Sequence, residues 1–174
     1  MEPRRKVPIH LVVILAVAVL LGLAVAIHSN APPQPASVPV GPGPEDRTIV
    51  AGLRVDLVTL GMPARAVEKR WGQATMRPTE SSLIYRFDSL GVTLGVRDDK
   101  VESILVKNPA LRTRGGVGVG SDVDQVIREF GTRYEFEGDP KSAYKLQYWD
   151  KGIHFTVEKD NVASILITQP VLGP

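Results

Sequence analysis

The side chains of this chain that could do chemistry are few and scattered. His154, the only histidine beyond residue 28, stands between Ile153 and Phe155. Strand alternation points it away from their apolar side, together with Thr156. A single imidazole with no second histidine and no nearby carboxylate in the sequence is a poor general base or metal ligand. We therefore expect a structural or surface role for His154.

Serines and glycines give no clearer signal of catalysis. Ser81, Ser82 and Ser121 lack the flanking pattern of a nucleophile elbow. Ser121 is better explained as a helix N-cap, and the other two as loop residues. Residues 114–120 (RGGVGVG) precede a predicted helix but match neither the P-loop nor the G-x-G-x-x-G pattern. We interpret this glycine run as a junction between two parts of the fold.

Metal and thiol chemistry find no support in the sequence. Asp98, Asp99 and Asp160 fall in predicted hairpin turns, where Asp is common, and the alternating ligands of a calcium loop are missing. The chain contains no cysteine, which removes thiolate catalysis and the lipid-modified cysteine of a lipoprotein. We expect no metal, no cofactor and no enzymatic activity.

Aromatic and basic side chains supply the remaining candidate, a protein-binding patch. Tyr148 and Trp149 are consecutive on a predicted strand, so one packs inside and the other can be exposed. Exposed aromatic residues and arginines are the usual anchors of protein interfaces. The predicted contact residues are Trp149, Tyr148, Arg86 and His154. Core packing explains most of the aromatics equally well, and the sequence leaves open which face of a sheet is free.

These residues belong to a sequence that repeats itself. Residues 60–73 (LGMPARAVEKRWGQ) and 119–132 (VGSDVDQVIREFGT) share a glycine, a valine six residues later, an aromatic at ten and a glycine at eleven. Residues 98–109 (DDKVESILVKNP) match residues 159–170 (KDNVASILITQP) in the same way. Such internal similarity predicts one structural unit used twice and a broad surface assembled from both copies.

Each copy is predicted to be a short helix followed by three strands. Pro63 suits a first helical position, Ser121 is the predicted N-cap of the second helix, and Gly72 and Gly131 are the predicted C-caps. The predicted strands are residues 83–87, 92–96 and 101–107 in the first copy, and 144–149, 153–158 and 162–168 in the second.

The fold class is therefore α+β, with two tandem repeats, each a short helix followed by a three-stranded antiparallel sheet. Hairpin turns are predicted at residues 97–100 and 159–161. Residues 103–106 and 164–167 are apolar on both faces, which indicates central strands that are covered on both sides or that join across the repeats.

The N-terminus is typical of a membrane anchor. Residues 1–8 carry three basic side chains, and residues 11–27 are seventeen apolar or small residues without a charge. A spanning helix needs about 17 to 25 such residues, and flanking cations stay on the cytoplasmic side. We expect a cytoplasmic tail (1–8), a transmembrane signal anchor (9–27) and a periplasmic or extracellular C-terminal part. A cleavable signal peptide is the alternative.

A proline-rich linker follows the predicted anchor. Residues 31–44 contain six prolines, a composition that favours an extended, semi-rigid spacer. The expected organisation is then a linker at 28–47, a first repeat at 48–110 and a second repeat at 111–174. The formal net charge of the whole chain is only +2, so nothing indicates a nucleic-acid partner.

The repeated pattern resembles a known family. The run from Gly61, Met62 and Pro63 through Val67 to Trp71 and Gly72, followed by three strands, is similar to the small exported proteins typified by BamE, also called SmpA or OmlA. Doubled in tandem, it resembles the architecture of the β-lactamase inhibitor protein. The resemblance implies an extracytoplasmic module that binds protein without catalysis. The missing lipoprotein cysteine and the duplication argue against transferring a role from BamE directly.

The sequence thus predicts a membrane-anchored, extracytoplasmic, non-catalytic module that binds a protein or an envelope polymer. A secreted enzyme inhibitor that resembles the β-lactamase inhibitor protein is the alternative. An exported hydrolase is a further alternative, which would need His154 to meet a serine and a carboxylate across the repeats.

Overall fold

A computed structural model describes residues 46–171 of the chain. The predicted tail (1–8), transmembrane segment (9–27) and nearly all of the proline-rich linker (28–47) lie outside the described residues. Within residues 46–171, no helix is long and apolar enough to cross a membrane.

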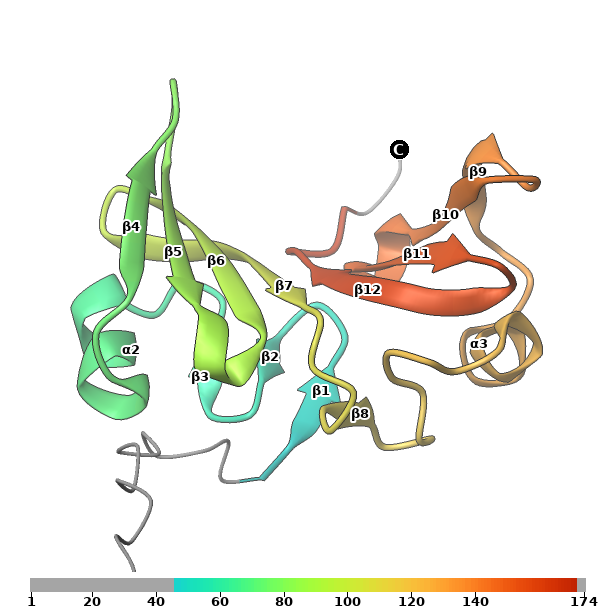
Figure 1. The fold of residues 1–174 in the computed structure, drawn as a ribbon, viewed down its shortest axis with the longest axis horizontal. Coiled ribbons are helices and arrows are strands. Elements are labelled where there is room, and N and C mark those ends of the chain that lie inside the picture. The colour runs from blue at the N-terminus through green and yellow to red at the C-terminus, as the bar shows by residue number, and fades with distance from the viewer. Residues whose placement is uncertain (1–45, 172–174) are drawn as a thin grey trace, which may run out of the picture. The chain divides into compact units, whose positions relative to one another are not determined.

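One antiparallel sheet of eight strands organises residues 75–167, in the order β4-β5-β6-β7-β12-β11-β10-β9 (Figure 1). The strands from the first repeat are β4 (Thr75–Pro78), β5 (Leu83–Phe87), β6 (Val92–Arg97) and β7 (Lys100–Val106). Those from the second are β9 (Glu135–Asp139), β10 (Ala143–Tyr148), β11 (Ile153–Glu158) and β12 (Asn161–Ile167). Each repeat forms a four-stranded meander, so the tandem α+β repeat is confirmed.

The two meanders join through their last strands. On β7 and β12, Ile104 faces Ile167, Leu105 faces Leu166, and Val106 faces Ile165. The apolar segments that the sequence placed centrally are therefore the seam of a continuous sheet. Of the two arrangements left open, the structure has the one in which the repeats join.

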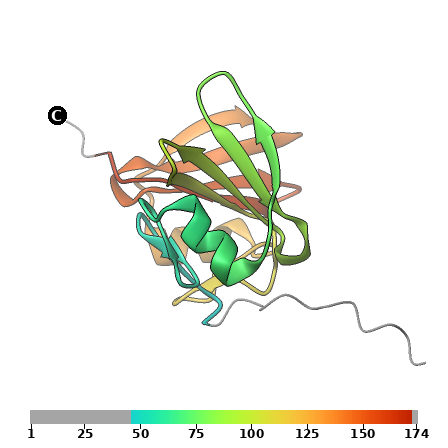
Figure 2. The same ribbon diagram turned by 90° about the vertical axis from the view of Figure 1, so that its left-hand side faces the viewer.

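Two short helices cover the same side of this sheet (Figures 1 and 2). They are α2 (Ala64–Trp71) and α3 (Val123–Phe130). The ring of Trp71 meets that of Phe87 edge-on at 5.4 Å, and the ring of Phe130 lies 5.2 Å from that of Phe155. Because large aromatic surfaces contribute much of the burial energy in a small core, these contacts fix which face of the sheet is the inner one.

The helix ends agree with the sequence in part. Gly72 and Gly131 end the helices with φ of 89° and 87°, as predicted for C-cap glycines. Pro63 is the N-cap of α2 and not its first helical residue. The N-cap of α3 is Asp122, whose carboxylate accepts from the Gln125 N–H at 2.7 Å.

The prediction of Ser121 as the N-cap is therefore wrong by one residue. Its hydroxyl oxygen accepts from the Gly118 N–H instead, at 3.1 Å, and this bond closes the glycine-rich loop before α3. A carboxylate is also a better partner than a hydroxyl for the positive end of a helix.

Both hairpin turns have the predicted geometry. Asp98 and Asp99 have φ of 50° and 59°, and Lys159 and Asp160 have φ of 51° and 62°. Two consecutive residues with positive φ define the tight turn that suits the twist of a hairpin.

The structure also contains strands that the sequence did not reveal. β4 and β9 form the two edges of the large sheet, and all their residues are exposed, so no apolar alternation marks them. A second, small sheet has the order β3-β2-β1-β8. Its strands are β1 (Thr48–Val50), β2 (Arg54–Val55), β3 (Val58–Thr59) and β8 (Arg112–Thr113). Because β1 pairs in parallel with β8, it ties the starts of the two repeats together.

Candidate protein-binding face

A single row of side chains crosses all eight strands of the large sheet. Successive facing pairs define the row as Thr75, Arg86, Thr93, Leu105, Leu166, His154, Gln147 and Glu135. Phe87 and Phe155, which contact the helices, are the chain neighbours of Arg86 and His154. Because successive side chains alternate between the faces of a sheet, the row lies on the face opposite α2 and α3, which we call the open face.

The centre of the row is apolar and its ends are polar. Leu105 and Leu166 occupy the middle and are only half-buried. The positions on either side differ between the repeats, since Thr93 on β6 corresponds to His154 on β11. The two halves of the open face are thus chemically unequal, and the half formed by the second repeat carries the imidazole.

A hollow of about 410 Å³ lies in that half of the open face. Its lining residues come from β7, β9, β10, β11, β12, the turn after β10 and the residue after β12: Leu105, Glu137, Lys145, Gln147, Trp149, His154, Thr156, Leu166 and Thr168. Leucines and an indole provide apolar walls, while Glu137 accepts from both Lys145, at 3.1 Å, and Gln147, at 2.8 Å. The hollow therefore combines an apolar interior with a rim of paired polar groups, as small binding sites commonly do.

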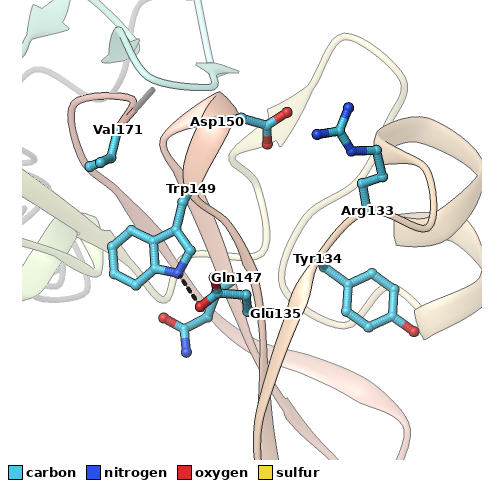
Figure 3. A pocket seen from close by; sticks show the side chains of 7 residues that line it. All are labelled: Arg133, Tyr134, Glu135, Gln147, Trp149, Asp150 and Val171. Atoms are coloured by element: carbon cyan, nitrogen blue, oxygen red, sulfur yellow. Dashed lines mark hydrogen bonds between the residues drawn. The ribbon is translucent and has the colours of Figure 1, made fainter. Parts of the chain in front are cut away.

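Trp149 is held in place by a short 3-10 turn, η2 (Trp149–Lys151), that follows β10. The backbone oxygen of Trp149 accepts from the Val171 N–H at 2.9 Å, and the Trp149 indole N–H donates to the Glu135 carboxylate at 3.0 Å. Figure 3 shows the indole beside Glu135 and Gln147, with the ring of Tyr134 turned away. The Trp149 side chain keeps 39% of its surface exposed, so a partner could still reach it.

His154 lies directly against this indole. The two ring centroids are 4.3 Å apart with an interplanar angle of 61°. The imidazole is 5% exposed, its Nε2 lies 3.1 Å from Thr168 Oγ1, and its Nδ1 has no hydrogen-bond partner. Burial lowers the pKa of His154, and the nearby charge of Lys145 lowers it further. Both effects favour the neutral form of the ring.

Tyr148 does not reach the open face. Its side chain is fully buried, and its hydroxyl donates to the Gly131 carbonyl oxygen at 2.8 Å. Its ring packs against those of Phe130 and Phe155. Of the consecutive pair Tyr148 and Trp149, Tyr148 is thus the inner residue, and we leave it out of the contact surface.

Arg86 lies on the open face but away from the hollow. It shares the row with His154 at a separation of four strands, roughly 19 Å at 4.8 Å per strand. Its guanidinium pairs with Asp88 at 2.7 Å, and both side chains are exposed. The structure brings together Trp149 and His154, and leaves Arg86 as a separate polar end of the same face.

The sequence reasoning missed most of the residues that shape the hollow. Leu105 and Leu166 were identified as parts of apolar strands, but nothing in the pattern placed them at a seam. Lys145 and Glu137 lie on adjacent strands at facing positions, and β9 was not predicted. Their contribution follows from strand pairing, which the sequence alone did not define.

The groups around His154 define what the hollow offers chemically. Within residues 46–171, no group of three or more histidine, aspartate or glutamate side chains is placed to hold a metal ion. The hydrogen-bond partner of His154 is Thr168, and not a serine or a carboxylate. The hollow can accept an apolar group and offer it directed hydrogen bonds.

The fold defines a class of protein, a tandem α+β repeat. It is similar to an uncharacterized protein from Escherichia coli, yfeY, with a TM-score of 0.50 and 13% sequence identity, over 70% of this chain and 100% of that one. At this identity the likeness shows the fold alone. No protein-family model and no curated protein matches the sequence.

Two further solved structures match part of the chain. One is an extracellular protein containing an SCP domain from Bacillus anthracis, with a TM-score of 0.47 and 9% identity. The other is a cysteine-rich secretory protein from Staphylococcus aureus, with a TM-score of 0.46 and 15% identity. Each match covers 63% of this chain and 44% of the other, so this chain spans less than half of their length.

Proposed function

We propose that this protein is a membrane-anchored, extracytoplasmic, non-catalytic module that binds another protein through its open face. The hollow beside Trp149 carries the proposal. It lies on the face that α2 and α3 leave uncovered, with half-buried leucines at its floor and an exposed indole at its edge. A buried apolar centre with an aromatic anchor and a polar rim is the usual arrangement of energetic hot spots in protein interfaces.

The sequence pattern supports the finer parts of this proposal. The basic N-terminus followed by residues 11–27 supports a signal anchor with the repeats outside the cytoplasm. The shared glycines and valines of the two repeats support a relationship to BamE-like modules, with a joined sheet in place of a single unit. A protein partner in the envelope suits both features.

Photo-crosslinking in intact cells tests the proposed face. A photoreactive phenylalanine analogue at Thr93, on the open face, is expected to capture a partner that mass spectrometry identifies. The same analogue at Lys69, an exposed residue of α2, is the control and should not capture it. Equal capture from both positions would contradict a role for the open face.

A series of variants tests which side chains of the open face contribute to binding of the partner. Trp149→Ala should weaken capture at Thr93 strongly, because the indole forms one wall of the hollow. Arg86→Ala should have a smaller effect, because an exposed charge at the edge of an interface contributes mainly to the association rate. The double variant should melt within a few degrees of the wild type. A protein that unfolds instead would assign these residues to stability.

The fate of the N-terminus separates this proposal from a secreted inhibitor. A membrane-anchored module keeps residues 1–27 in the membrane fraction, where mass spectrometry of the intact chain would find them. A secreted inhibitor loses them and appears in the medium. Recovery of only the shortened chain outside the cell would therefore replace the leading proposal with the alternative.

A further inference from the structure

The two edge strands of the large sheet, β4 and β9, lie at its opposite ends (Figure 1). Within residues 46–171, each has a neighbouring strand on one side only. Every residue of both strands is exposed. Because the outward N–H and C=O groups of an edge strand can bond a further strand, an open edge is a place where another chain can add.

Each edge carries one large exposed apolar side chain on the inner face. Met76 on β4 faces the buried Tyr85 and is 55% exposed. Phe136 on β9 faces the buried Leu146 and is 49% exposed. A strand added to either edge would cover the apolar side chain there, and burial of apolar surface favours association.

The open face of the two edges carries opposite charges. On β9, Glu135, Glu137 and Asp139 occupy alternate positions, so all three carboxylates lie on this face. Lys145 neutralises one of them through its 3.1 Å ion pair with Glu137. On β4, Arg77 lies on the open face and has no ion-pair partner among the described residues. The β9 edge is therefore acidic and the β4 edge basic.

These charges decide which edges of two copies can meet. An antiparallel pairing that sets Met76 opposite Phe136 of a second copy also sets Arg77 opposite Glu135 of that copy. Pairing of two β4 edges would instead bring two Arg77 side chains onto one face, and pairing of two β9 edges would bring together the carboxylates of both copies. Like charges on adjacent strands are unfavourable. The pairing of unlike edges combines apolar contact with charge attraction.

The backbone of β4 suits such a pairing. The Thr79 N–H donates to the Ser82 carbonyl oxygen at 2.9 Å, and bonded facing pairs alternate with unbonded ones along an antiparallel ladder. Met76 and Pro78 therefore point their backbone groups away from β5. Pro78 lacks an N–H, which limits nonspecific strand addition at this edge, but Met76 offers both a donor and an acceptor.

We propose that copies of this chain associate head to tail, with β4 of one copy antiparallel to β9 of the next. The sheet then continues from one copy into the other. This interface uses the edges of the sheet, and it does not rest on the proposed function. Because the two copies contribute different surfaces, each pair keeps one free edge of either kind, to which further copies can add.

Cysteine crosslinking tests this arrangement, because the chain contains no cysteine of its own. Two differently tagged full-length chains, one with Met76→Cys and the other with Phe136→Cys, are produced in one cell and oxidised before extraction. Facing positions on paired strands lie within the range of Cα separations that a disulfide needs. The matched controls are two tagged Met76→Cys chains and two tagged Phe136→Cys chains, which place the same thiols at like edges.

The mixed pair should form the crosslinked heterodimer at least about fivefold more than either like pair, because only unlike edges attract each other. Equal crosslinking in all three combinations would overturn the proposal, since thiols that meet by chance do not distinguish the edges. Absence of a crosslink in the mixed pair would overturn it as well.

Arg77→Glu tests the contribution of charge. Added to the Met76→Cys chain, it replaces attraction to Glu135 of the second copy by repulsion and should reduce crosslinking to the Phe136→Cys chain about fivefold. Arg128→Glu makes the same change of charge at an exposed position of α3, in the other repeat, and should leave the yield unchanged. Equal losses in both variants, or a loss in neither, would contradict the proposed pairing.

Association of the unmodified chain gives an independent measurement. Two differently tagged wild-type chains in mild detergent should copurify at about 50 mM salt and lose most of this association at about 500 mM, because salt screens exposed charges. Copurification that does not respond to salt would assign the contact to another surface and overturn the proposal, as would no copurification at either concentration. If circular dichroism shows that a cysteine variant is unfolded, this comparison decides.

Discussion

Leu105 on β7 faces Leu166 on β12, and these two residues hold corresponding positions in the two repeats. On either side of them, Ile104 faces Ile167, which corresponds to Val106 in the second repeat, and Val106 faces Ile165, which corresponds to Ile104. Each repeat therefore pairs through its last strand with the same strand of the other repeat, so the seam has an approximate local twofold symmetry. The seam converts two small meanders into one sheet with a shared core, which a unit of this size could not easily bury alone.

This seam predicts that the two repeats unfold together. Trp71 reports the first repeat and Trp149 the second, so the single-tryptophan variants Trp149→Phe and Trp71→Phe each report one half. In each variant, the urea midpoint from fluorescence should coincide with that from circular dichroism, because the sheet is continuous and the transition cooperative. Two separate midpoints would show that the repeats are independent.

Gly91 and Gly152 form a matched pair for substitution. Both follow a 3-10 turn with φ of 61°, a conformation that costs most other residues about 1 kcal/mol or more. A Cβ at Gly91 would lie 3.2 Å from the nearest Asn108 atoms, whereas one at Gly152 would press on backbone atoms of Gly52 and Pro170 at 2.8 and 2.9 Å.

Gly91→Ala should therefore lower the free energy of unfolding by about 1 kcal/mol, and Gly152→Ala by at least about 3 kcal/mol. Chemical denaturation of both variants measures the difference. Similar losses would show that the neighbourhood of Gly152 relaxes easily.

Tyr148 should make the protein sensitive to alkali. Burial raises the pKa of its hydroxyl from 10.0 to about 12, with a smaller contribution from Tyr134. Because the unfolded chain releases this proton near pH 10 and the folded chain only near pH 12, the stabilisation is complete below pH 10. It is lost as the pH rises between these values.

Tyr148→Phe should flatten this alkaline loss of stability. At neutral pH it should cost about 1 kcal/mol, because the hydroxyl no longer donates to Gly131. Denaturation curves between pH 8 and pH 12 measure both effects. Capture of a partner at the open face should not change, and a change would place Tyr148 in the interface after all.

His154 should make the free energy of unfolding depend on pH in the acidic range. Its folded-state pKa lies below the ordinary value of 6.5, chiefly because of burial. The unfolded chain therefore binds a proton more readily, so the contribution is fully present above pH 6.5 and is lost as the pH falls through the folded-state pKa. Lys145 on β10 and Glu137 on β9 line the same hollow as the ring, and Glu135 on β9 accepts from the neighbouring Trp149 indole.

Denaturation of the wild type and of His154→Gln between pH 5 and pH 8 measures this effect. The stability of the variant should depend less on pH over the acidic part of this range. Identical pH profiles would show that another group causes the loss. NMR titration of the imidazole then gives the pKa of His154 directly.

Local sequence signals predicted the helix C-caps and the hairpin turns, where one or two residues determine the backbone conformation. Gly72 and Gly131 end the helices because positive φ favours glycine, and the Asp98-Asp99 turn adopts positive φ as its composition suggests. Ser121 failed as a cap because the helix begins one residue later than predicted, so that Asp122 caps it and the Ser121 hydroxyl accepts from the Gly118 N–H instead. Strands β4 and β9 escaped prediction because strands exposed on every residue carry no periodic signal.

The sequence alone established that one helix-and-strand unit occurs twice, because glycines, valines and aromatics recur at spacings set by local backbone geometry. It also established that one of Tyr148 and Trp149 faces inward, because neighbouring side chains on a strand alternate. Which of them does so, and which face stays open, depended on the helices that pack against the sheet. The hollow itself depended on the pairing of β7 with β12 and of β9 with β10. Contacts between distant segments created it, and no local pattern encodes them.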